Sequence, residues 1–362
     1  MAELLHDPRR RNLAILAGIA VLMILFAVLA LWHRQSESAP RYEEDSFFPK
    51  LAQRVRQIAD IRISSKAGTF DVAFKPDAGW VLPQHDNYPA SFERLRETVV
   101  GMAALQTIEP KTARAEWLPL VNLDAPPRGS GTEITLLNEK GNVIASMIAG
   151  NTIDIGDQSG AQGLFARKPD SNQSWLLRSV FTPMASASQW LDKHVMDIDM
   201  ARVQEVDVDP AGSMSFTARR DTPAAQDFTL SNIPAGRTIA YDGAPDGMAG
   251  AITNFTFDDV KAARDFDFSD SSKTARLVTR TFDGLIVSVE VIQQGSDYWA
   301  TVSADAQPGK PDAAREAREI DAHASGWAYK LPLYKGQLFM TTLASLLKPV
   351  GGTTPPQQPP AQ

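Results

Sequence analysis

Apolar and polar residues follow three patterns along this chain of 362 residues. Residues 13–32 form one unbroken apolar run, residues 58–305 consist mainly of short alternating stretches, and residues 311–347 contain two stretches of helical spacing. Such a run predicts a helix buried in lipid, alternation predicts strands with one buried face, and spacings of three and four predict amphipathic helices. The chain should therefore be a membrane segment followed by a sheet-rich soluble part.

The apolar run extends from Leu13 through Ile19 and Leu25 to Trp32 and contains no charged residue. As a helix rising about 1.5 Å per residue it would be roughly 30 Å long, which matches the hydrocarbon core of a bilayer. A cleaved signal peptide is one alternative, but its apolar region is only about 7–15 residues long and ends at a site with small residues. A buried core helix is the other. The run predicts a retained membrane anchor.

Flanking charge predicts the orientation of this anchor. Arg9, Arg10 and Arg11 stand directly before it, and only two widely spaced arginines follow it closely. Because Lys and Arg collect on the cytoplasmic side, residues 1–12 should lie in the cytoplasm and the bulk of the chain outside. The expected location is the bacterial inner (cytoplasmic) membrane, with a single pass and a periplasmic or extracytoplasmic bulk, and the lipid bilayer is the first expected partner.

The soluble part contains a similar pattern twice. Residues 58–74 and 203–216 both alternate around a turn that contains glycine, Gly68 in one and Gly212 in the other. The apolar positions Ile58, Ile61 and Ile63 correspond to Val203, Val206 and Val208 at a separation of 145 residues. Residues 105–113 likewise parallel residues 255–263. Each stretch predicts a half-buried hairpin, and the correspondence predicts a duplicated unit.

Each unit then contains a helix and a second hairpin. In the first unit Ser91 is placed to cap a helix whose apolar residues recur at spacings of three and four, namely Phe92, Leu95, Val99 and Met102. Asp283-Gly284 in the second unit is a strong tight-turn signal between two alternating stretches. We expect two tandem repeats, each an antiparallel sheet with a helix packed against it.

The C-terminal part departs from the repeat. Residues 311–323 predict a solvated surface helix, Trp327 to Leu333 alternate as a strand, and Leu338 to Leu347 predict an amphipathic closing helix. The final residues read PVGGTTPPQQPPAQ, which predicts a disordered or polyproline-like tail. Such a tail is either a docking ligand for an aromatic groove or an unstructured end.

The predicted fold class is α+β: one N-terminal transmembrane helix, two tandem repeats of antiparallel β-sheet with a packed helix, and a C-terminal helix. The predicted segments are a cytoplasmic tail 1–12, a transmembrane helix 13–32, a stalk 33–46, a first α+β repeat 47–190, a second α+β repeat 191–305, a C-terminal helix-strand-helix segment 306–348 and a disordered Pro-rich tail 349–362.

The amino-acid composition argues against several classes of function. The net charge is −7, and no run of Lys or Arg follows the anchor, which argues against nucleic acid as a partner. The absence of Cys removes disulfides, thiolate metal sites, iron–sulfur clusters and Cys nucleophiles. The five histidines form no metal-binding motif, and neither a serine-hydrolase elbow nor a phosphate-binding loop is present. The sequence therefore predicts no catalytic, cofactor-binding or metal-binding residue, and no cofactor.

Two features leave room for a ligand site. Residues 265–270 alternate Asp with Phe or Ser, which suits a strand with an acidic outer face and lacks the spacing of a calcium loop. A glycosidase carboxylate pair stays open, because such residues lie far apart in sequence. Six tryptophans are spread along the soluble part, and each is a core residue or a ligand platform.

Several motifs in this order resemble the membrane-anchored bacterial proteins that carry domain of unknown function 4340. They are Arg9 to Asn12, Phe48 to Leu51, Ile108 to Thr112, Trp190 to Asp192 with Asp197 to Asp199, and Ser325 to Pro332. The resemblance covers nearly the whole chain. It implies a protein found alongside ABC transporters, including auxiliary proteins of the gliding-motility type, and provides no catalytic residues.

The resulting expectation is a non-enzymatic, single-pass, membrane-anchored periplasmic accessory protein that binds an ABC-transporter permease or ATPase subunit or an extracellular polymer. The alternative is a cell-envelope polysaccharide-binding protein or hydrolase that uses Asp and Glu residues. A third reading is a structural spacer of the envelope without a cleft or an apolar surface patch.

Overall fold

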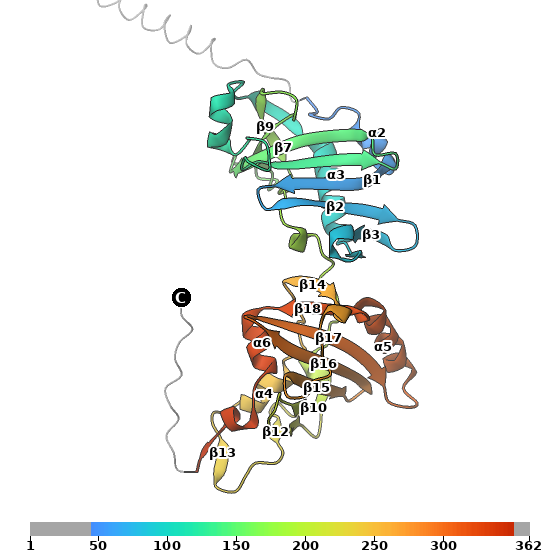
Figure 1. The fold of residues 1–362 in the computed structure, drawn as a ribbon, viewed down its shortest axis with the longest axis vertical. Helices are drawn as coiled ribbons and strands as arrows, with labels where there is room; N and C mark the ends of the chain where they lie inside the picture. Colours follow the sequence, from blue (N-terminus) through green and yellow to red (C-terminus); the bar gives the residue numbers. More distant parts are fainter. Residues whose placement is uncertain (1–44, 351–362) are drawn as a thin grey trace, which may run out of the picture.

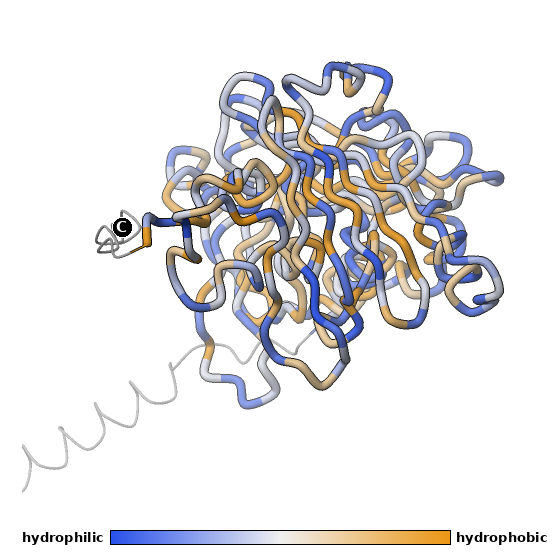
Figure 2. Tube along the Cα trace, turned by 90° about the horizontal axis from the view of Figure 1, so that it is seen from below, coloured by the Kyte–Doolittle hydropathy of each residue, from blue (hydrophilic) through white to orange (hydrophobic). Residues whose placement is uncertain are grey.

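The structure is a computed structural model that describes residues 45–350. Two antiparallel sheets follow each other along the long axis of the molecule (Figure 1). Apolar residues, drawn in orange, run along the strands through the middle of the molecule, and polar residues concentrate in the peripheral loops (Figure 2). The main buried core is continuous from one sheet into the other.

The first sheet has nine strands in the order β4-β3-β2-β1-β6-β7-β8-β9-β5. The strands are β1 Ile58–Ser65, β2 Gly68–Lys75, β3 Gly79–Leu82, β4 Tyr88–Pro89, β5 Gln106–Pro110, β6 Thr132–Asn138, β7 Val143–Ile153, β8 Gln162–Arg167 and β9 Ser174–Ser179. Alternation in β1 has the expected result, because Ile61 and Ile63 are buried whereas Arg62 between them is exposed.

The second sheet has eight strands in the order β12-β11-β10-β15-β16-β17-β18-β14. The strands are β10 Val203–Asp209, β11 Phe216–Arg219, β12 Thr229–Leu230, β14 Asp259–Ala262, β15 Thr274–Thr281, β16 Leu285–Gln294, β17 Asp297–Ala306 and β18 Trp327–Leu331. A small two-stranded sheet pairs β13 Arg237–Ile239 with β19 Leu347–Pro349. The second sheet thus takes in β18 from the segment 306–348.

The two sheets share the same strand order, and the first adds only β4 at its edge. Their pairing irregularities also correspond. A bulge interrupts the pairing of β1 with β6 between Ile58 and Asp60, and a bulge interrupts the pairing of β10 with β15 between Val203 and Glu205. Because a bulge fixes strand register and twist, its presence at the same place gives the two sheets a common local geometry.

Helices are few and short. They are α2 Leu51–Arg54, α3 Phe92–Ala104, α4 Ala244–Ala249, α5 Pro311–Ala324 and α6 Leu333–Phe339, with the 3-10 turns η2 Val55–Gln57, η3 Pro83–His85, η4 Ala115–Val121, η5 Ala187–Gln189, η6 Met200–Arg202, η7 Ala263–Asp265 and η8 Leu343–Leu346. Helix α3 begins at Ser91, whose hydroxyl accepts a hydrogen bond from the Arg94 amide, and it buries Leu95, Val99 and Met102.

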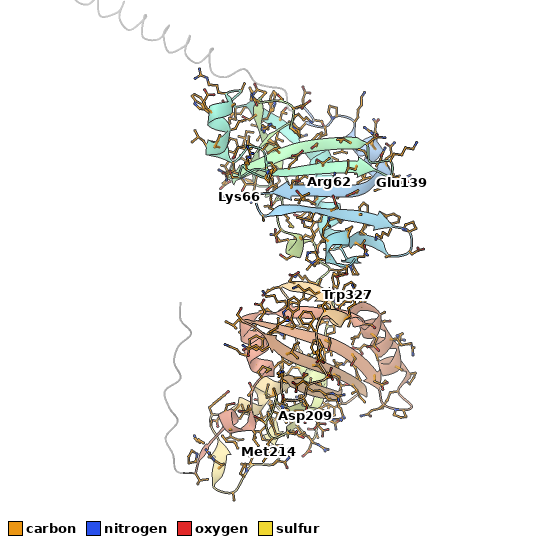
Figure 3. All side chains as sticks on the ribbon, in the orientation of Figure 1. Arg62, Lys66, Glu139, Asp209, Met214 and Trp327 are labelled. Atoms are coloured by element: carbon orange, nitrogen blue, oxygen red, sulfur yellow. The ribbon has the colours of Figure 1, made fainter. Side chains whose placement is uncertain are left out.

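The two units meet where η3 and β4 of the first contact β14 and β18 of the second. Trp327 at the start of β18 lies at this contact (Figure 3). Arg264 and Asp86 form an ion pair of 2.7 Å across it. This contact places the two sheets relative to each other.

The predicted fold class is wrong. Residues 45–350 are mostly antiparallel sheet with few helices, whereas the prediction was an α+β chain with a transmembrane helix, one packed helix in each repeat and a C-terminal helix. Within these residues, no helix has both the length and the apolar character needed to cross a bilayer. The anchor expected at 13–32, with Leu13, Ile19, Leu25 and Trp32, lies outside the described residues, as do the topology-setting arginines Arg9, Arg10 and Arg11.

The predicted C-terminal helix is also wrong. Helix α6 ends at Phe339, and Leu343 to Leu346 form a 3-10 turn before β19. Leu347 pairs with Ile239 in the small sheet, so tertiary strand pairing replaces the helical hydrogen bonds that the apolar spacing suggested. Helix α5 was expected to be a solvated surface helix, and one of its faces is buried through Ala313, Ala317 and Ile320. Alanines make up most of this face, where the helix packs on β17.

Candidate functional site

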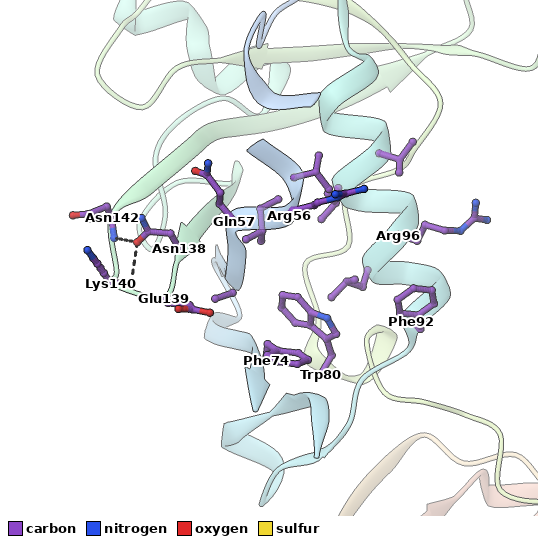
Figure 4. A pocket seen from close by; sticks show the side chains of 16 residues that line it. Arg56, Gln57, Phe74, Trp80, Phe92, Arg96, Asn138, Glu139, Lys140 and Asn142 are labelled. Carbon is purple, nitrogen blue, oxygen red and sulfur yellow. Dashed lines mark hydrogen bonds between the residues drawn. The ribbon is translucent and has the colours of Figure 1, made fainter. Parts of the chain in front are cut away.

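A groove in the first unit lies between α3 and the ends of β1, β2 and β3, with a cavity volume of about 800 Å³ (Figure 4). The turn between β6 and β7 closes one end, and the Asn138 side chain holds this turn by accepting hydrogen bonds from the Lys140 and Asn142 amides at 3.0 and 2.9 Å. The lining residues are Val55, Arg56, Gln57, Ile58, Ala59, Phe74, Trp80, Phe92, Leu95, Arg96, Val99, Val100, Asn138, Glu139, Lys140 and Asn142.

The floor of the groove is apolar and accessible to solvent. Phe70 and Val72 of β2 are buried, but Phe74 on the same face is 49% exposed because the sheet extends beyond its cover. Its ring meets Trp80 edge-on at 5.7 Å. On α3, Phe92 is 66% exposed and Val100 is 52% exposed. Several large exposed apolar side chains around one recess are typical of a binding surface.

Charged side chains with no partner surround this floor. Arg56, Arg96 and Lys140 stand against the single carboxylate Glu139, and all four are exposed. Among residues 45–350, none of these four side chains forms an ion pair, whereas Arg62, Arg94, Arg202, Arg264 and Arg280 all do. Three cations against one carboxylate leave an excess of two positive charges at the groove.

Strand register identifies the matching place in the second unit. Asp60 pairs with Ala73 in the first sheet, and Glu205 pairs with Arg219 in the second. The bulges make Asp60 and Glu205 equivalent, so their partners Ala73 and Arg219 are equivalent as well. The residue that follows Ala73 is then equivalent to the residue that follows Arg219. Phe74 therefore corresponds to Arg220.

Arg220 fills this position in the second unit. The residue is 6% exposed, and its guanidinium donates hydrogen bonds of 2.7–2.9 Å to the carbonyls of Met200, Ala201, Val203 and Ala225. It also lies over the rings of Phe228 and Phe282, at 4.9 and 5.6 Å from their centroids. In the second unit the Arg220 side chain therefore fills the position at which the first unit has an open groove.

Two further pairs of equivalent positions also differ between the two units. By the same register, Glu139 corresponds to Phe282 and Gln57 to Arg202. Glu316 of α5 holds Arg202 through two hydrogen bonds of 2.8 and 2.7 Å. The first unit has no helix between β8 and β9, where the second has α5 between β17 and β18.

Asp60 and Lys168, which do not line the groove, have shifted pKa values. Burial and the neighbouring carboxylate of Asp71 raise the pKa of Asp60 to about 6, and among residues 45–350 its Oδ1 atom is buried without a hydrogen-bond partner. Burial lowers the pKa of Lys168 to about 8. Lys168 Nζ donates to the Phe47 carbonyl at 3.1 Å and lies over the Phe48 ring, which fastens the start of the described chain to the first sheet.

The histidines of the described chain stay apart. His85 Nδ1 lies 3.4 Å from an Asp259 oxygen at the contact between the units. Within residues 45–350, no three His, Asp or Glu side chains gather as a metal-binding group.

The acidic stretch 265–270 begins at the last residue of η7 and continues as a loop, rather than forming the expected strand. Asp267 and Asp270 accept hydrogen bonds from Ser269 and Ser272, so local turns replace strand pairing. The expected inward direction of the phenylalanines is nevertheless correct, because Phe266 packs on Trp299 with centroids 4.7 Å apart.

No pattern in the sequence predicted the groove. Trp80 was expected to be either a core residue or a ligand platform, and Arg56, Arg96 and Glu139 belong to no sequence motif. A signal was present in the duplication, because Phe74 and Arg220 differ in polarity at matched positions. Only the strand register shows that they match.

Comparison with known proteins gives one match. No curated protein and no solved structure matches the chain. The family model described as "Domain of unknown function (DUF4340)" matches residues 80–274, which is more than half of the 362 residues. The match begins at Trp80 in the groove and ends at the first residue of β15. The chain therefore belongs to the family defined by domain of unknown function DUF4340.

Proposed function

We propose that this protein is a non-catalytic accessory protein at the bacterial inner membrane, with residues 45–350 outside the cytoplasm, and that the groove of its first unit docks a subunit of an ABC-type transporter. The apolar segment 13–32 and the arginines before it support the location. The resemblance to transporter-associated proteins supports the class of partner.

The observation that carries the docking role is the difference between the two units. Arg220 closes the second unit, whereas Phe74 at the matching position leaves an apolar recess exposed. Exposing large apolar side chains to water is unfavourable, at about 25 cal/mol per Å² of apolar surface. A covering partner would remove this surface from water.

A binding role fits the groove better than hydrolysis. A glycosidase needs two carboxyl groups facing each other across the scissile bond. Glu139 is the one carboxylate among the described residues that line this groove. The polysaccharide-hydrolase alternative therefore has no carboxylate pair at this site to rest on.

Purification from the native membrane tests the proposal. The tagged full chain is extracted in mild detergent, and co-purifying proteins are quantified by mass spectrometry for the wild type, Phe74→Arg and Leu120→Arg. Phe74→Arg copies the side chain that closes the second unit. Leu120, on η4, is 76% exposed and does not line the groove, so it provides a matched control.

We expect a permease or ATPase at near-stoichiometric amounts with the wild type and with Leu120→Arg, and its loss with Phe74→Arg. Thermal unfolding of the three proteins checks that they are folded. Recovery of the wild type alone, or full retention of the transporter subunit by Phe74→Arg, would overturn the proposal.

A further inference from the structure

The groove also indicates the chemistry of its occupant. We propose that it binds an acidic amphipathic peptide segment of the partner, in which large apolar side chains alternate with carboxylates. This inference rests on the proposed function, since it names the part of the partner that docks.

The exposed surface of the groove is elongated along α3. Phe92, Arg96 and Val100 are four residues apart on α3, so they form one stripe along the helix. At about 1.5 Å per residue this stripe is roughly 12 Å long. A linear segment that lies along a helix and a strand end, with apolar side chains as anchors, is a recurring mode of peptide recognition.

A positive charge stands between the apolar side chains of this stripe. Arg96 lies between two exposed apolar positions, and Arg56 lines the recess from η2, just before β1. An anionic lipid has its charge at one end of its apolar part. A peptide can place a carboxylate between two apolar side chains, which matches the order along this stripe.

The charged side chains that line the groove are mostly positive. In the part of the chain that the structure describes, Arg56, Arg96 and Lys140 have no carboxylate partner, and they outnumber Glu139 by three to one. Carboxylates on the bound peptide would pair with these cations, and the same cations would repel a basic peptide. The net charge of the whole protein is −7, so this positive site is local and distinguishes the groove from its surroundings.

The test measures binding of two dye-labelled synthetic peptides of about 14 residues. One alternates Leu and Phe with Glu, and the other has Lys in place of every Glu. The full chain is held in nanodiscs of uncharged lipid, and binding is followed by fluorescence anisotropy. Vesicles of anionic phosphatidylglycerol and the acidic polysaccharide polygalacturonate are added as competitors.

We expect the acidic peptide to bind at least about tenfold more tightly than the basic one, and to bind more weakly as salt rises from about 50 to about 300 mM. The double variant Arg56→Glu with Arg96→Glu should reverse this preference. Arg318→Glu, on the exposed side of α5, is the matched control and should leave the preference unchanged. Phe74→Arg should abolish binding of the acidic peptide.

Equal binding of both peptides, or displacement of the acidic peptide by the vesicles or the polysaccharide with higher apparent affinity, would overturn the peptide assignment. If neither peptide binds but Phe74→Arg still loses the transporter subunit in membrane purification, the peptide assignment fails and the docking function stands. If Phe74→Arg retains that subunit, the docking function itself fails.

Discussion

The ring of Tyr88 in β4 meets the ring of Trp327 in β18 edge-on, with centroids 5.0 Å apart, and this pair joins the two sheets. Tyr88 is buried, and its hydroxyl donates a hydrogen bond of 2.9 Å to the Asp192 carbonyl in the connection between the units. Phe257 and Tyr329 of the second unit complete the aromatic contact at 6.0 and 6.3 Å from the Tyr88 ring. The units are therefore coupled mainly through aromatic packing.

Trp327→Ala should uncouple the two units. Large-to-small changes of buried aromatic side chains cost about 3–5 kcal/mol, and since Trp327 is half-buried we expect a loss of roughly 2 kcal/mol in the free energy of unfolding. Calorimetry should then resolve two transitions where the wild type shows one. Trp117→Ala, which removes a half-exposed tryptophan away from the contact, is the control and should leave one transition. A single unshifted transition in Trp327→Ala would refute this coupling.

Asp60 should make stability fall as pH rises from about 4 to about 6. Its folded-state pKa of about 6 lies above the ordinary value of 3.8, so the folded protein binds a proton more tightly than the unfolded chain. The unfavourable carboxylate is absent below this window and fully present above it. Asp60→Asn should therefore stabilise the protein by about 1–2 kcal/mol above pH 7, a range reduced because Asp60 is only half-buried, and change little at pH 4.

Urea unfolding at both pH values measures this difference. The structure predicts that the variant gains stability only at the higher pH. A stabilisation of the same size at pH 4 would show that the ionised carboxylate is not its cause.

Two glycine-to-alanine changes should have opposite signs. Alanine in a helix is favoured over glycine by about 1 kcal/mol. At Gly247 in α4 the nearest atom to an added Cβ is Leu338 Cδ1 at 4.0 Å, so Gly247→Ala should stabilise the protein by about 0.5–1 kcal/mol. At Gly101 in α3 the added Cβ would overlap the Phe181 ring, so Gly101→Ala should destabilise it by about 1–3 kcal/mol. Chemical denaturation distinguishes them, and stabilisation by Gly101→Ala would mean that α3 does not pack on Phe181 as described.

Arg220 should matter more to stability than its neighbour Arg219. Arg220→Met keeps an unbranched chain but leaves four hydrogen bonds to buried and part-buried carbonyls unmade, which should cost at least about 3 kcal/mol. Arg219 is exposed and pairs with Glu205 only at 3.5 Å, so Arg219→Met should cost less than about 1 kcal/mol. Similar thermal midpoints for the two variants would contradict the closure of the second unit by Arg220.

Local patterns in the sequence determined many elements of the described chain. Alternation at Ile58 to Ile63 and at Val203 to Val208 falls on β1 and β10, because one face of each strand is buried. Ser91 caps α3 as expected, and Asp283-Gly284 turns between β15 and β16. These features depend on neighbours within a few residues, so the sequence carries them directly.

Features that depend on residues far apart in the sequence were determined only by the tertiary structure. The apolar spacing from Leu338 to Leu347 suggested a helix, but pairing of Leu347 with Ile239 made its end a strand. The groove likewise exists because Phe74, Phe92 and Glu139 come from a strand, a helix and a turn that only the folded sheet brings together. The sequence by itself determined the two alternating units. Only their three-dimensional register revealed that Arg220 closes one and Phe74 leaves the other open, because that comparison depends on which residues face each other across strands.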